Sequence, residues 1–334
     1  MITEGSLCTG YDGLGTALRA RHPDLVTRWQ AENDDDMARV LAHHHPGVLN
    51  VRDVTATLWD LAPAVDILSA GFPCQPVSAA GRQRGDADDR WLWPYVLDVV
   101  RAVRPGAVFL ENVQNIVSIE KGRLLAGILD DLRSAGYRSR WTVLGACAVG
   151  APHHRHRWFL VAGHVGPSAP PPERIGRIAT CGAPRSGGRV LLPSPTTSDA
   201  NGPGRASKTG GDDLRTTIAE LLPTPTTSNA HGNDVNARGE LLLPGAVQPE
   251  RWGRFAEAVA LWERVTGTPA PEPTEPNSKG DGRRLSPLLP EWMMGLPPGH
   301  LTSLLPRSAA IRAAGNGVVP LQAAAAWDML TATP

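Results

Sequence analysis

Short apolar runs alternate with helix-like segments over the first 165 residues of the chain. The apolar runs read "GSLCTG", "LVTRWQAEND", "VDILSAGFPC", "AVFLENV" and "RWFLVAG", and the helix-like segments read "LGTALRARHP", "DDMARVLAHHH", "WLWPYVLDVVRAVRP" and "GRLLAGILDDLRSAGY". Strands and helices that alternate at this spacing predict an α/β fold with a doubly wound, mostly parallel sheet. Ligands of such sheets bind beyond the carboxyl ends of the strands, so the residues at those ends are the first candidates for a functional site.

The composition changes after residue 165. Residues 166–282 are rich in Pro, Gly, Ser and Thr and contain an internal echo, "LLPSPTTSDANG" against "LLPTPTTSNAHG". We predict a large domain over 1–165, a smaller loop-rich domain over 166–282, and a C-terminal segment, 283–334, that returns to the large domain. Within the smaller domain, residues 250–267 predict a helix that leads back to the large domain, and residues 269–282 predict a polar linker without order.

The chain carries no net charge, because Lys plus Arg and Asp plus Glu both number 33. Attraction to nucleic acid must therefore come from local clustering, and residues 166–215, with seven basic and four acidic side chains, carry a net charge of +3. The four cysteines form no CxxC pair, which argues against a zinc site, and no run of about 18 apolar residues predicts a membrane span. We expect a cytoplasmic protein with no metal ion and no membrane attachment.

The first candidate site is the glycine-rich turn "LCTGYDGLG", in which Gly10, Gly13 and Gly15 lie between a predicted strand and a predicted helix. Glycine lets the backbone approach a ligand closely, and a helix N-terminus favours negative charge. Glu32 ends the next strand, where an acid can bind ribose hydroxyls. The pairing indicates a nucleoside cofactor, although such a turn can also simply close the corner between strand and helix. Asp53 lies at a further turn and is either a cofactor residue or a helix cap.

The second candidate site is Cys74 in "GFPCQPVSAAG". Pro73 and Pro76 fix the backbone and remove N–H donors, so the loop is stiff and suits a nucleophile. The alternative is a small buried hydrophobe, which is what a lone cysteine most often is. The rest of the chain decides between the two.

Two predicted strands carry residues that would complete a catalytic set with Cys74. "FLENV" places Glu111 and Asn112 at a strand end, and a carboxylate that ends a buried strand is costly without a role or a partner. "APHHRHRWFLVA" places Arg155 and Arg157 two residues apart, hence on one face of a strand. A cysteine, a glutamate and paired arginines at strand ends form a nucleophile, an acid and anion stabilisers.

These segments resemble, in order, the motifs of the DNA (cytosine-5)-methyltransferase family. "SLCTGYDGLG" resembles the family's S-adenosylmethionine loop, "GFPCQPVSAAG" its catalytic loop, "ENV" its glutamate motif, "PHHRHR" its Gln-x-Arg-x-Arg motif, and "RRLSP" and "GNGVVP" its last two blocks. The resemblance covers residues 1–165 and 283–330. It implies the sheet of S-adenosylmethionine-dependent methyltransferases, with catalysis and cofactor binding in 1–165 and target recognition in 166–282.

The resemblance implies cytosine-5 methylation of duplex DNA, with S-adenosylmethionine as methyl donor and the target cytosine flipped out of the helix. Cys74 would add to C6 of the base, and Glu111 would hydrogen-bond N3 and the exocyclic amine, which requires a protonated carboxyl that burial favours. Arg157 would contact the carbonyl oxygen of the ring and hold the glutamate. Arg155 would support the loop or a phosphate, and Asn112 would order the glutamate strand or the catalytic loop. The implied DNA-binding residues are Gln75, Ser78, Arg82, Arg84 and Arg283.

The implied cofactor site draws on the glycine-rich turn, on two acidic strand ends, on the catalytic loop and on the last block. Cys8 stands where the family carries a Phe that stacks on adenine, so Leu7 or Trp59 would have to supply an apolar wall. The cofactor-binding residues that the resemblance implies are Leu7, Cys8, Thr9, Gly10, Asp12, Gly13, Gly15, Glu32, Asn33, Asp53, Val54, Pro73 and Asn316.

Three further positions depart from the family pattern. Asp12 replaces a glycine, and its carboxylate would bind the ammonium group of the methionine moiety or cap the following helix. His153 replaces a Gln, and Gly317 replaces a common Ser.

The predicted partner is double-stranded DNA, bound by a monomer, with a cognate restriction endonuclease left open. One alternative is an RNA cytosine-5 methyltransferase that uses the same site. The other is a catalytically silent DNA-binding protein, against which the presence of Cys74, Glu111 and Arg157 argues. We also hypothesise that each copy of the internal echo supplies one recognition loop.

Overall fold

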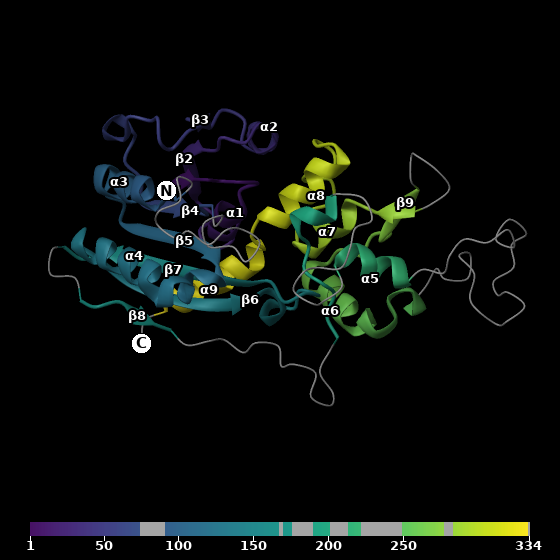
Figure 1. Cartoon of the computed structure of the whole chain (residues 1–334). Coiled ribbons are helices and arrows are strands. Elements are labelled where there is room, and N and C mark those ends of the chain that lie inside the picture. The colour runs from purple at the N-terminus through teal and green to yellow at the C-terminus, as the bar shows by residue number, and fades with distance from the viewer. Residues whose placement is uncertain are drawn as a thin grey trace, which may run out of the picture. The chain divides into compact units, whose positions relative to one another are not determined.

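The computed structural model describes residues 1–73, 91–166, 170–175, 190–200, 213–221, 249–276 and 283–332. The chain forms two compact units (Figure 1). The first consists of Met1–Val149, His156–Thr180 and Gly317–Pro334, and the second of Gly150–Arg155 and Cys181–Asn316. The C-terminal segment therefore rejoins the first unit at Gly317 and not at residue 283 as the sequence pattern indicated.

Within the described residues, the first unit is built on an eight-stranded sheet in the order β3-β2-β1-β4-β5-β7-β6-β8. The neighbouring strands β3, β2, β1, β4 and β5 are parallel to one another. Strand β7 runs antiparallel to both of its neighbours, β5 and β6. The prediction of a mostly parallel α/β sheet is confirmed. The strands are β1 (Ile2–Leu7), β2 (Leu25–Ala31), β3 (Leu49–Asn50), β4 (Ile67–Ala70), β5 (Ala107–Val113), β6 (Tyr137–Gly145), β7 (His156–His164) and β8 (Glu173–Arg174).

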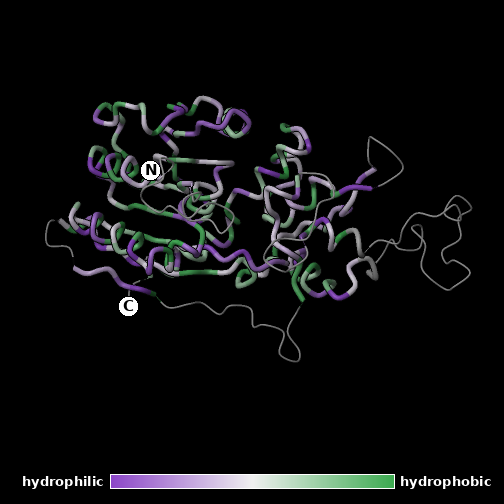
Figure 2. Tube along the Cα trace, viewed as in Figure 1, coloured by the Kyte–Doolittle hydropathy of each residue, from purple (hydrophilic) through white to green (hydrophobic). Residues whose placement is uncertain are grey.

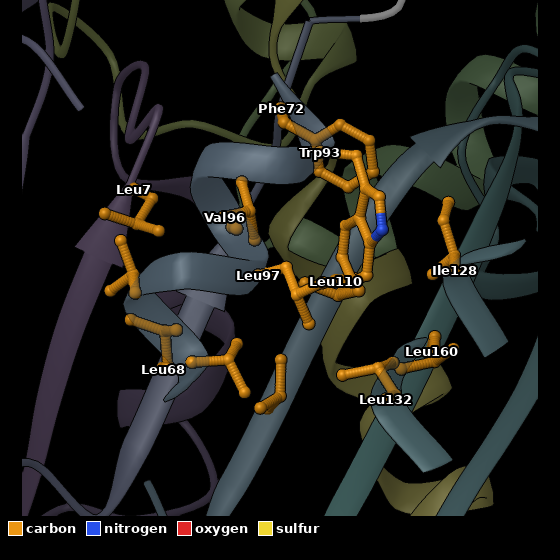
Figure 3. Close-up of a cluster of buried hydrophobic side chains, with 14 of the residues drawn as sticks. Leu7, Leu68, Phe72, Trp93, Val96, Leu97, Leu110, Ile128, Leu132 and Leu160 are labelled. Carbon is orange, nitrogen blue, oxygen red and sulfur yellow. The ribbon is translucent and has the colours of Figure 1, made fainter. Parts of the chain in front are cut away.

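Helices cover both faces of this sheet because alternate residues of its central strands point to opposite sides. Leu68, Leu110 and Leu160 join one core with α3 and α4 (Figure 3). Phe109 and Phe159 belong to a second core with α1 and α9. Figure 2 shows the apolar residues concentrated along these strands. The helices of this unit are α1 (Gly13–Arg19), α2 (Asp35–His44), α3 (Trp93–Val103), α4 (Arg123–Ser134) and α9 (Pro320–Thr331), with short 3-10 turns η1 (Trp59–Leu61), η3 (Gln114–Val117), η4 (Ile119–Gly122) and η5 (Ala146–Val149).

Helix α2 begins and ends as its sequence predicts. The Asp34 carboxylate accepts a hydrogen bond from the Met37 N–H at 3.0 Å and so caps the first turn. Asp35 and Asp36 lie in that first turn and His43 and His44 in the last, where each charge type suits the helix dipole.

The second unit has its own interior of apolar side chains, among them Leu289, Trp292 and Met293, and it also contains buried polar groups. The Glu291 carboxylate is buried and accepts backbone N–H bonds from Gly299, Leu301 and Thr302 at 2.6 to 2.8 Å. The Trp262 indole donates to the Trp292 carbonyl at 2.9 Å. The elements described here are η6 (Thr197–Ala200), α5 (Leu214–Leu221), η8 (Pro249–Phe255), α6 (Ala256–Thr266), β9 (Thr274–Pro276), β10 (Arg283–Leu285), α7 (Leu288–Met293) and α8 (Arg307–Asn316).

Two sequence-based expectations about this unit need correction. The predicted linker 269–282 is partly ordered, because β9 pairs with β10 as an antiparallel hairpin. The predicted helix 250–267 is interrupted at Gly253, where φ is +44°, and it belongs to the second unit instead of leading back to the first. In the first copy of the echo, Leu192, Asp199 and Ala200 are buried and η6 packs on α8, while Thr196, Thr197 and Ser198 are exposed, so its role as a recognition loop stays a prediction. The second copy lies outside the described residues, except for Leu221.

Strand β6 is the main element of the first unit that the sequence pattern did not predict. Its odd-numbered residues Tyr137, Ser139 and Trp141 are buried, whereas Arg138 is exposed. A strand with arginines on one side lacks the continuous apolar run by which the other central strands are recognised. No helix in the described residues is long and apolar enough to cross a membrane.

The departure at Gly317 has a structural explanation in the first unit. The Tyr11 hydroxyl donates to the Val318 carbonyl at 2.8 Å, and the Tyr11 ring is buried. A Cβ atom on Gly317 would overlap Cε1 of that ring. The glycine thus accommodates Tyr11, and the serine expected from the family pattern would not fit without a shift of the ring.

Replacing Gly317 by Ala should lower the free energy of unfolding by about 1–3 kcal/mol, because the new methyl group overpacks a buried ring. Urea unfolding at constant temperature measures the change. Gly127→Ala is the matched control, since a Cβ at this site in α4 meets nothing within 4 Å, and we expect it to stabilise by about 0.5–1 kcal/mol. Equal stability of Gly317→Ala and wild type would contradict the overlap.

Candidate active site

Glu111 and Arg157 form an ion pair at the ends of two antiparallel strands. In the register of β5 with β7, Glu111 lies opposite Phe159 and Val113 opposite Arg157. The two charged residues are therefore diagonal neighbours on one face of the sheet. Arg157 Nε lies 2.9 Å from Glu111 Oε1, with the two side chains 14% and 13% exposed. The sequence analysis placed these residues at strand ends, and the antiparallel pairing joins them.

Asn112 connects this pair to the entry of the Cys74 loop. Its side chain points to the opposite face from Glu111, is buried, and donates from Nδ2 to the Phe72 carbonyl at 3.2 Å. Its Oδ1 accepts the Val113 N–H at 2.9 Å. Asn112 thus holds the backbone two residues before Cys74.

Gly71 brings the glutamate end of β5 and the glycine-rich turn to the same place. A Cβ atom on Gly71 would lie 3.6 Å from Glu111 Oε2 and 3.7 Å from the Cys8 carbonyl oxygen, which is ordinary van der Waals contact. Sequence analysis assigned no role to Gly71. Its neighbours show that the Glu111 carboxylate, the first turn and the start of the Cys74 loop are close together.

The glycine-rich turn is held by the acid that ends β2. Gly10 N–H donates to Glu32 Oε2 at 2.7 Å, and Asp34 N–H donates to Glu32 Oε1 at 2.9 Å. Burial raises the pKa of Glu32 despite these bonds. Asn50, which the sequence analysis did not single out, holds the Glu32 backbone through its side-chain amide at 3.0 and 3.1 Å.

Two predicted cofactor residues from other segments, Glu32 and Asp53, act electrostatically on a third, Cys8. Burial, followed by the Glu32 and Asp53 carboxylates, raises the pKa of the Cys8 thiol to about 12. Cys8 has a positive φ of 49°, as does Gly10 at 57°, and nothing lies within 4 Å of a Cβ placed on Gly10. The turn therefore leaves open space above Gly10.

The remaining cofactor candidates occupy varied positions. The Asp53 carboxylate accepts from the Thr55 N–H and hydroxyl, both at 2.8 Å, which is a local turn cap. Asn33 and Pro73 are exposed, and the Val54 carbonyl accepts the Trp59 indole N–H at 2.9 Å. Leu7 has no exposed area, and Trp59 is 8% exposed and packs against Trp29; that one of them forms an apolar wall for adenine stays a prediction. The hydroxyl of Thr9 donates to the Ser6 carbonyl at 3.3 Å.

Asp12 does not cap α1, contrary to one of its two predicted roles. Its carboxylate is buried and contacts the Arg19 guanidinium and, at 2.8 Å, His45 Nε2. A Cβ on Gly15 would overlap Asp12 Oδ1, and one on Gly13 would approach Val318. For these two glycines the structure thus gives a packing reason. The expectation that Asp12 meets the cofactor stays a prediction.

Arg155 and Arg157 do not share one face of a strand, which corrects the sequence-based expectation. Strand β7 begins at His156, and Arg155 precedes it with a φ of +32°. Within the second unit, Arg155 Nη1 donates to the Pro195 carbonyl at 3.1 Å and Nη2 to the Gly315 carbonyl at 2.8 Å. Arg155 is therefore engaged with backbone of its own unit.

Three other predicted or departing residues also lie in the second unit. His153 is fully buried and its Nε2 lies 3.0 Å from the Met293 carbonyl, so it packs where the family has Gln. Arg283 is exposed on β10 and donates to the Thr274 carbonyl and hydroxyl at 2.8 and 2.6 Å. Asn316 ends α8, directly before the chain rejoins the first unit.

Several predicted residues lie outside the described part of the chain: Cys74, Gln75, Ser78, Arg82 and Arg84. Among the described residues, no group of His, Cys, Asp or Glu is arranged to hold a metal ion.

The sequence and the fold agree with one family. The profile of the C-5 cytosine-specific DNA methylases matches residues 2–174, which is more than half of the chain. The chain belongs to the C-5 cytosine-specific DNA methylase family.

Its relatives include bacterial modification enzymes. The Type II methyltransferase M.NlaX of Neisseria lactamica is 36% identical over 156 residues, which is 46% of this chain and 50% of that protein. The Type II methyltransferase M.HhaI of Haemophilus parahaemolyticus is 36% identical over 110 residues, or 33% of this chain and 34% of that protein. The matched region thus spans half of the length of these relatives or less.

Two solved structures share the fold over nearly the whole chain. A mutant of DNMT2 from Spodoptera frugiperda gives a TM-score of 0.56 at 16% identity and covers 99% of both chains. A putative DNA modification methyltransferase from an Escherichia coli prophage gives 0.55 at 16% identity, covering 99% of this chain and 98% of that one. At this identity they show the architecture.

The buried Glu4 below the turn makes stability depend on pH in a defined direction. Burial, together with the Asp12 carboxylate, raises the pKa of Glu4 from 4.5 to about 7. Between these values the folded chain holds a proton that the unfolded chain has released, so the free energy of unfolding should fall as pH rises through this window. Glu4→Gln should remove this dependence and stabilise the protein at pH 8 by about 1–3 kcal/mol.

Urea unfolding at pH 5 and pH 8 measures this difference. Asp60→Asn, at an exposed carboxylate, is the control and should leave the pH dependence as in wild type. A Glu4→Gln variant that still loses stability between pH 5 and pH 7 as wild type does would show that Glu4 does not hold the proton.

Proposed function

We propose that this chain is a DNA (cytosine-5-)-methyltransferase that uses S-adenosylmethionine to methylate one cytosine within a specific duplex sequence. The observation that carries the proposal is the Glu111–Arg157 ion pair, with 2.9 Å between Arg157 Nε and Glu111 Oε1. Glu111 lies beside Gly71, and Cys74 follows Gly71 by three residues in the sequence. Membership of the C-5 cytosine-specific family supports the substrate class. Of the alternatives, a catalytically silent DNA-binding protein would have no need of this ion pair.

Cys74 acts as the nucleophile in this proposal. Its thiolate forms a bond to C6 of the flipped-out cytosine, and the electron pair of the C5–C6 double bond makes C5 nucleophilic. After the methyl group is added at C5, loss of the C5 proton re-forms the double bond and expels the thiolate. The Asn112 bond to the Phe72 carbonyl supports this role by fixing the backbone that leads into the loop.

Glu111 and Arg157 bind the edge of the base whose ring nitrogen and carbonyl oxygen gain electron density. Glu111 hydrogen-bonds N3 and the exocyclic amine, and Arg157 contacts the ring carbonyl oxygen. Because Arg157 uses Nε for Glu111 and Nη1 for the His156 carbonyl at 3.0 Å, its position is set before any base arrives. Such preorganised charge lowers the cost of forming the adduct.

The first unit has a cradle that fits the cofactor. Glu32 at the end of β2 suits ribose hydroxyls, and the open space above Gly10 admits a ligand close to the backbone. When bound, S-adenosylmethionine supplies an electrophilic methyl group. The chain would hold it with Glu32, Asp53 and the turn from Cys8 to Gly13, and Asn316 of the last block is a further candidate.

The second unit would recognise the DNA sequence. Arg283 on β10 lies within the described part of the chain and is a candidate for a phosphate contact. Gln75, Ser78, Arg82 and Arg84 would contact the backbone or fill the space that the flipped base leaves. Arg155 contributes by holding the Pro195 and Gly315 carbonyls rather than by touching the base. A monomer in the cytoplasm, paired with a restriction endonuclease, is consistent with relatives that are Type II methyltransferases.

Duplex DNA that contains 5-fluorocytosine should trap the protein covalently in the presence of S-adenosylmethionine, because fluorine cannot leave C5 as a proton does. A duplex library that covers every short sequence context serves as substrate, and a denaturing gel with peptide mass spectrometry locates the bond at Cys74. Cys74→Ser should give no trapped complex. If folded, cofactor-loaded wild type forms no adduct in any context, the proposed reaction is wrong.

Arg157→Lys should reduce kcat by about 10- to 100-fold, because an ammonium cannot bond both Glu111 and the base as the guanidinium fork does. The affinity for S-adenosylmethionine should stay as in wild type, since Arg157 bonds Glu111 and not the cofactor turn. Single-turnover methylation of a cognate duplex and titration calorimetry measure the two quantities. An unchanged kcat would remove Arg157 from the mechanism.

A further inference from the structure

Helix α2 is tied to the glycine-rich turn at both of its ends. At its start, Glu32 accepts the Asp34 N–H at 2.9 Å with one carboxylate oxygen and the Gly10 N–H at 2.7 Å with the other. At its end, His45 Nε2 lies 2.8 Å from Asp12 Oδ2. The same short turn is thus held at Gly10 from one end of the helix and at Asp12 from the other.

Asp12 has a backbone conformation that depends on such contacts. Its φ of 69° and ψ of 38° lie in the left-handed region, which is disfavoured for residues with a Cβ atom. Its N–H donates to the Thr9 carbonyl and its carbonyl accepts the Thr16 N–H, both at 2.9 Å. The backbone of Asp12 therefore belongs to the turn, while its side chain is anchored below it.

The anchor is a largely buried cluster of ionisable groups from four segments. Arg19 at the end of α1 contacts Asp12 and lies 3.9 Å from the Glu4 carboxylate of β1, and His45 follows α2. Ser69 of β4 and Thr27 of β2 donate to Glu4 at 2.6 and 3.0 Å. Charge-assisted bonds in a buried setting are strong and directional. The cluster therefore fixes the carboxylate of Asp12, and through it the turn.

We propose that His45 is a positioning residue for the cofactor: together with Arg19 it holds the Asp12 carboxylate, and so fixes the Gly10–Gly13 backbone against which S-adenosylmethionine binds. The inference rests on the proposed function, because it concerns the cofactor of that reaction. It assigns a role to His45, the last of the three consecutive histidines at the end of this helix.

The test compares four full-length proteins by titration calorimetry with S-adenosylmethionine: wild type, His45→Leu, His45→Gln and His43→Leu. His45→Leu should bind about tenfold more weakly, which corresponds to the loss of one charge-assisted bond. His45→Gln should recover affinity to within about threefold of wild type, because its amide nitrogen can donate to Asp12. His43→Leu removes an exposed imidazole from the same helix end and should bind as wild type does.

Two measurements separate positioning from a general loss of structure. Urea unfolding should show each variant folded at the assay temperature, and affinity for duplex DNA should equal that of wild type. Asp12→Asn removes the negative charge that Arg19 and His45 both contact through Oδ2, so it should also weaken cofactor binding, and it replaces His45→Leu if that variant does not fold.

Equal cofactor affinity of wild type and His45→Leu, or a His45→Gln variant as weak as His45→Leu, would overturn the inference. If Asp12→Asn must replace His45→Leu, cofactor affinity equal to wild type would overturn it as well. A wild-type protein that binds no S-adenosylmethionine would instead overturn the proposed function, and the inference with it.

Discussion

The antiparallel pairing of β7 with β5 is the constraint on which the proposed catalytic arrangement depends. In an all-parallel sheet the end of β5 and the start of β7 would lie at opposite edges, and Glu111 could not meet Arg157. Reversal of β7 brings these side chains together as diagonal neighbours at 2.9 Å. Because both charges are mostly buried, the pair is preorganised, and the same edge carries the backbone that leads to Cys74. The proposed chemistry follows from this single reversal in an otherwise parallel region.

Buried carboxylates give the cofactor side of the first unit its character. Glu32, Asp12 and Glu4 lie close to the glycine-rich turn, and each is held by N–H, hydroxyl or cationic donors from other strands and helices. Burying a charge is costly unless it is paired, so each buried carboxylate indicates where its donors must lie. Contacts of the turn also account for two departures from the family pattern. Asp12 replaces a glycine because Arg19 and His45 receive its carboxylate, and Gly317 replaces a serine because Tyr11 fills the space.

Much of the fold was predictable because its central strands are apolar on both faces. Continuous runs such as "VFL" in β5 identify a buried strand with helices on either side, and the polar residue that follows marks the functional edge. Strand β6 escaped prediction because Arg138 and Arg140 interrupt its apolar pattern, although Ser139 and Trp141 are buried. The β9–β10 hairpin was not predicted, because Pro and Gly dominate the sequence around it. Its two strands are not adjacent in the sequence, and contacts between them, not local propensity, set their pairing.

The sequence by itself determined the fold class and the order of the motifs, and it made Glu111, Asn112, Arg157 and Glu32 candidates for a site, because polar residues at either end of an apolar strand are recognisable from local pattern alone. Only the tertiary structure decided which side chains meet. It paired Glu111 with Arg157, turned Arg155 toward Pro195 and Gly315, and gave Asp12 the partners Arg19 and His45. The physical reason is that strand direction, register and left-handed backbone at single residues are set by contacts between segments distant in the chain, which no local pattern encodes.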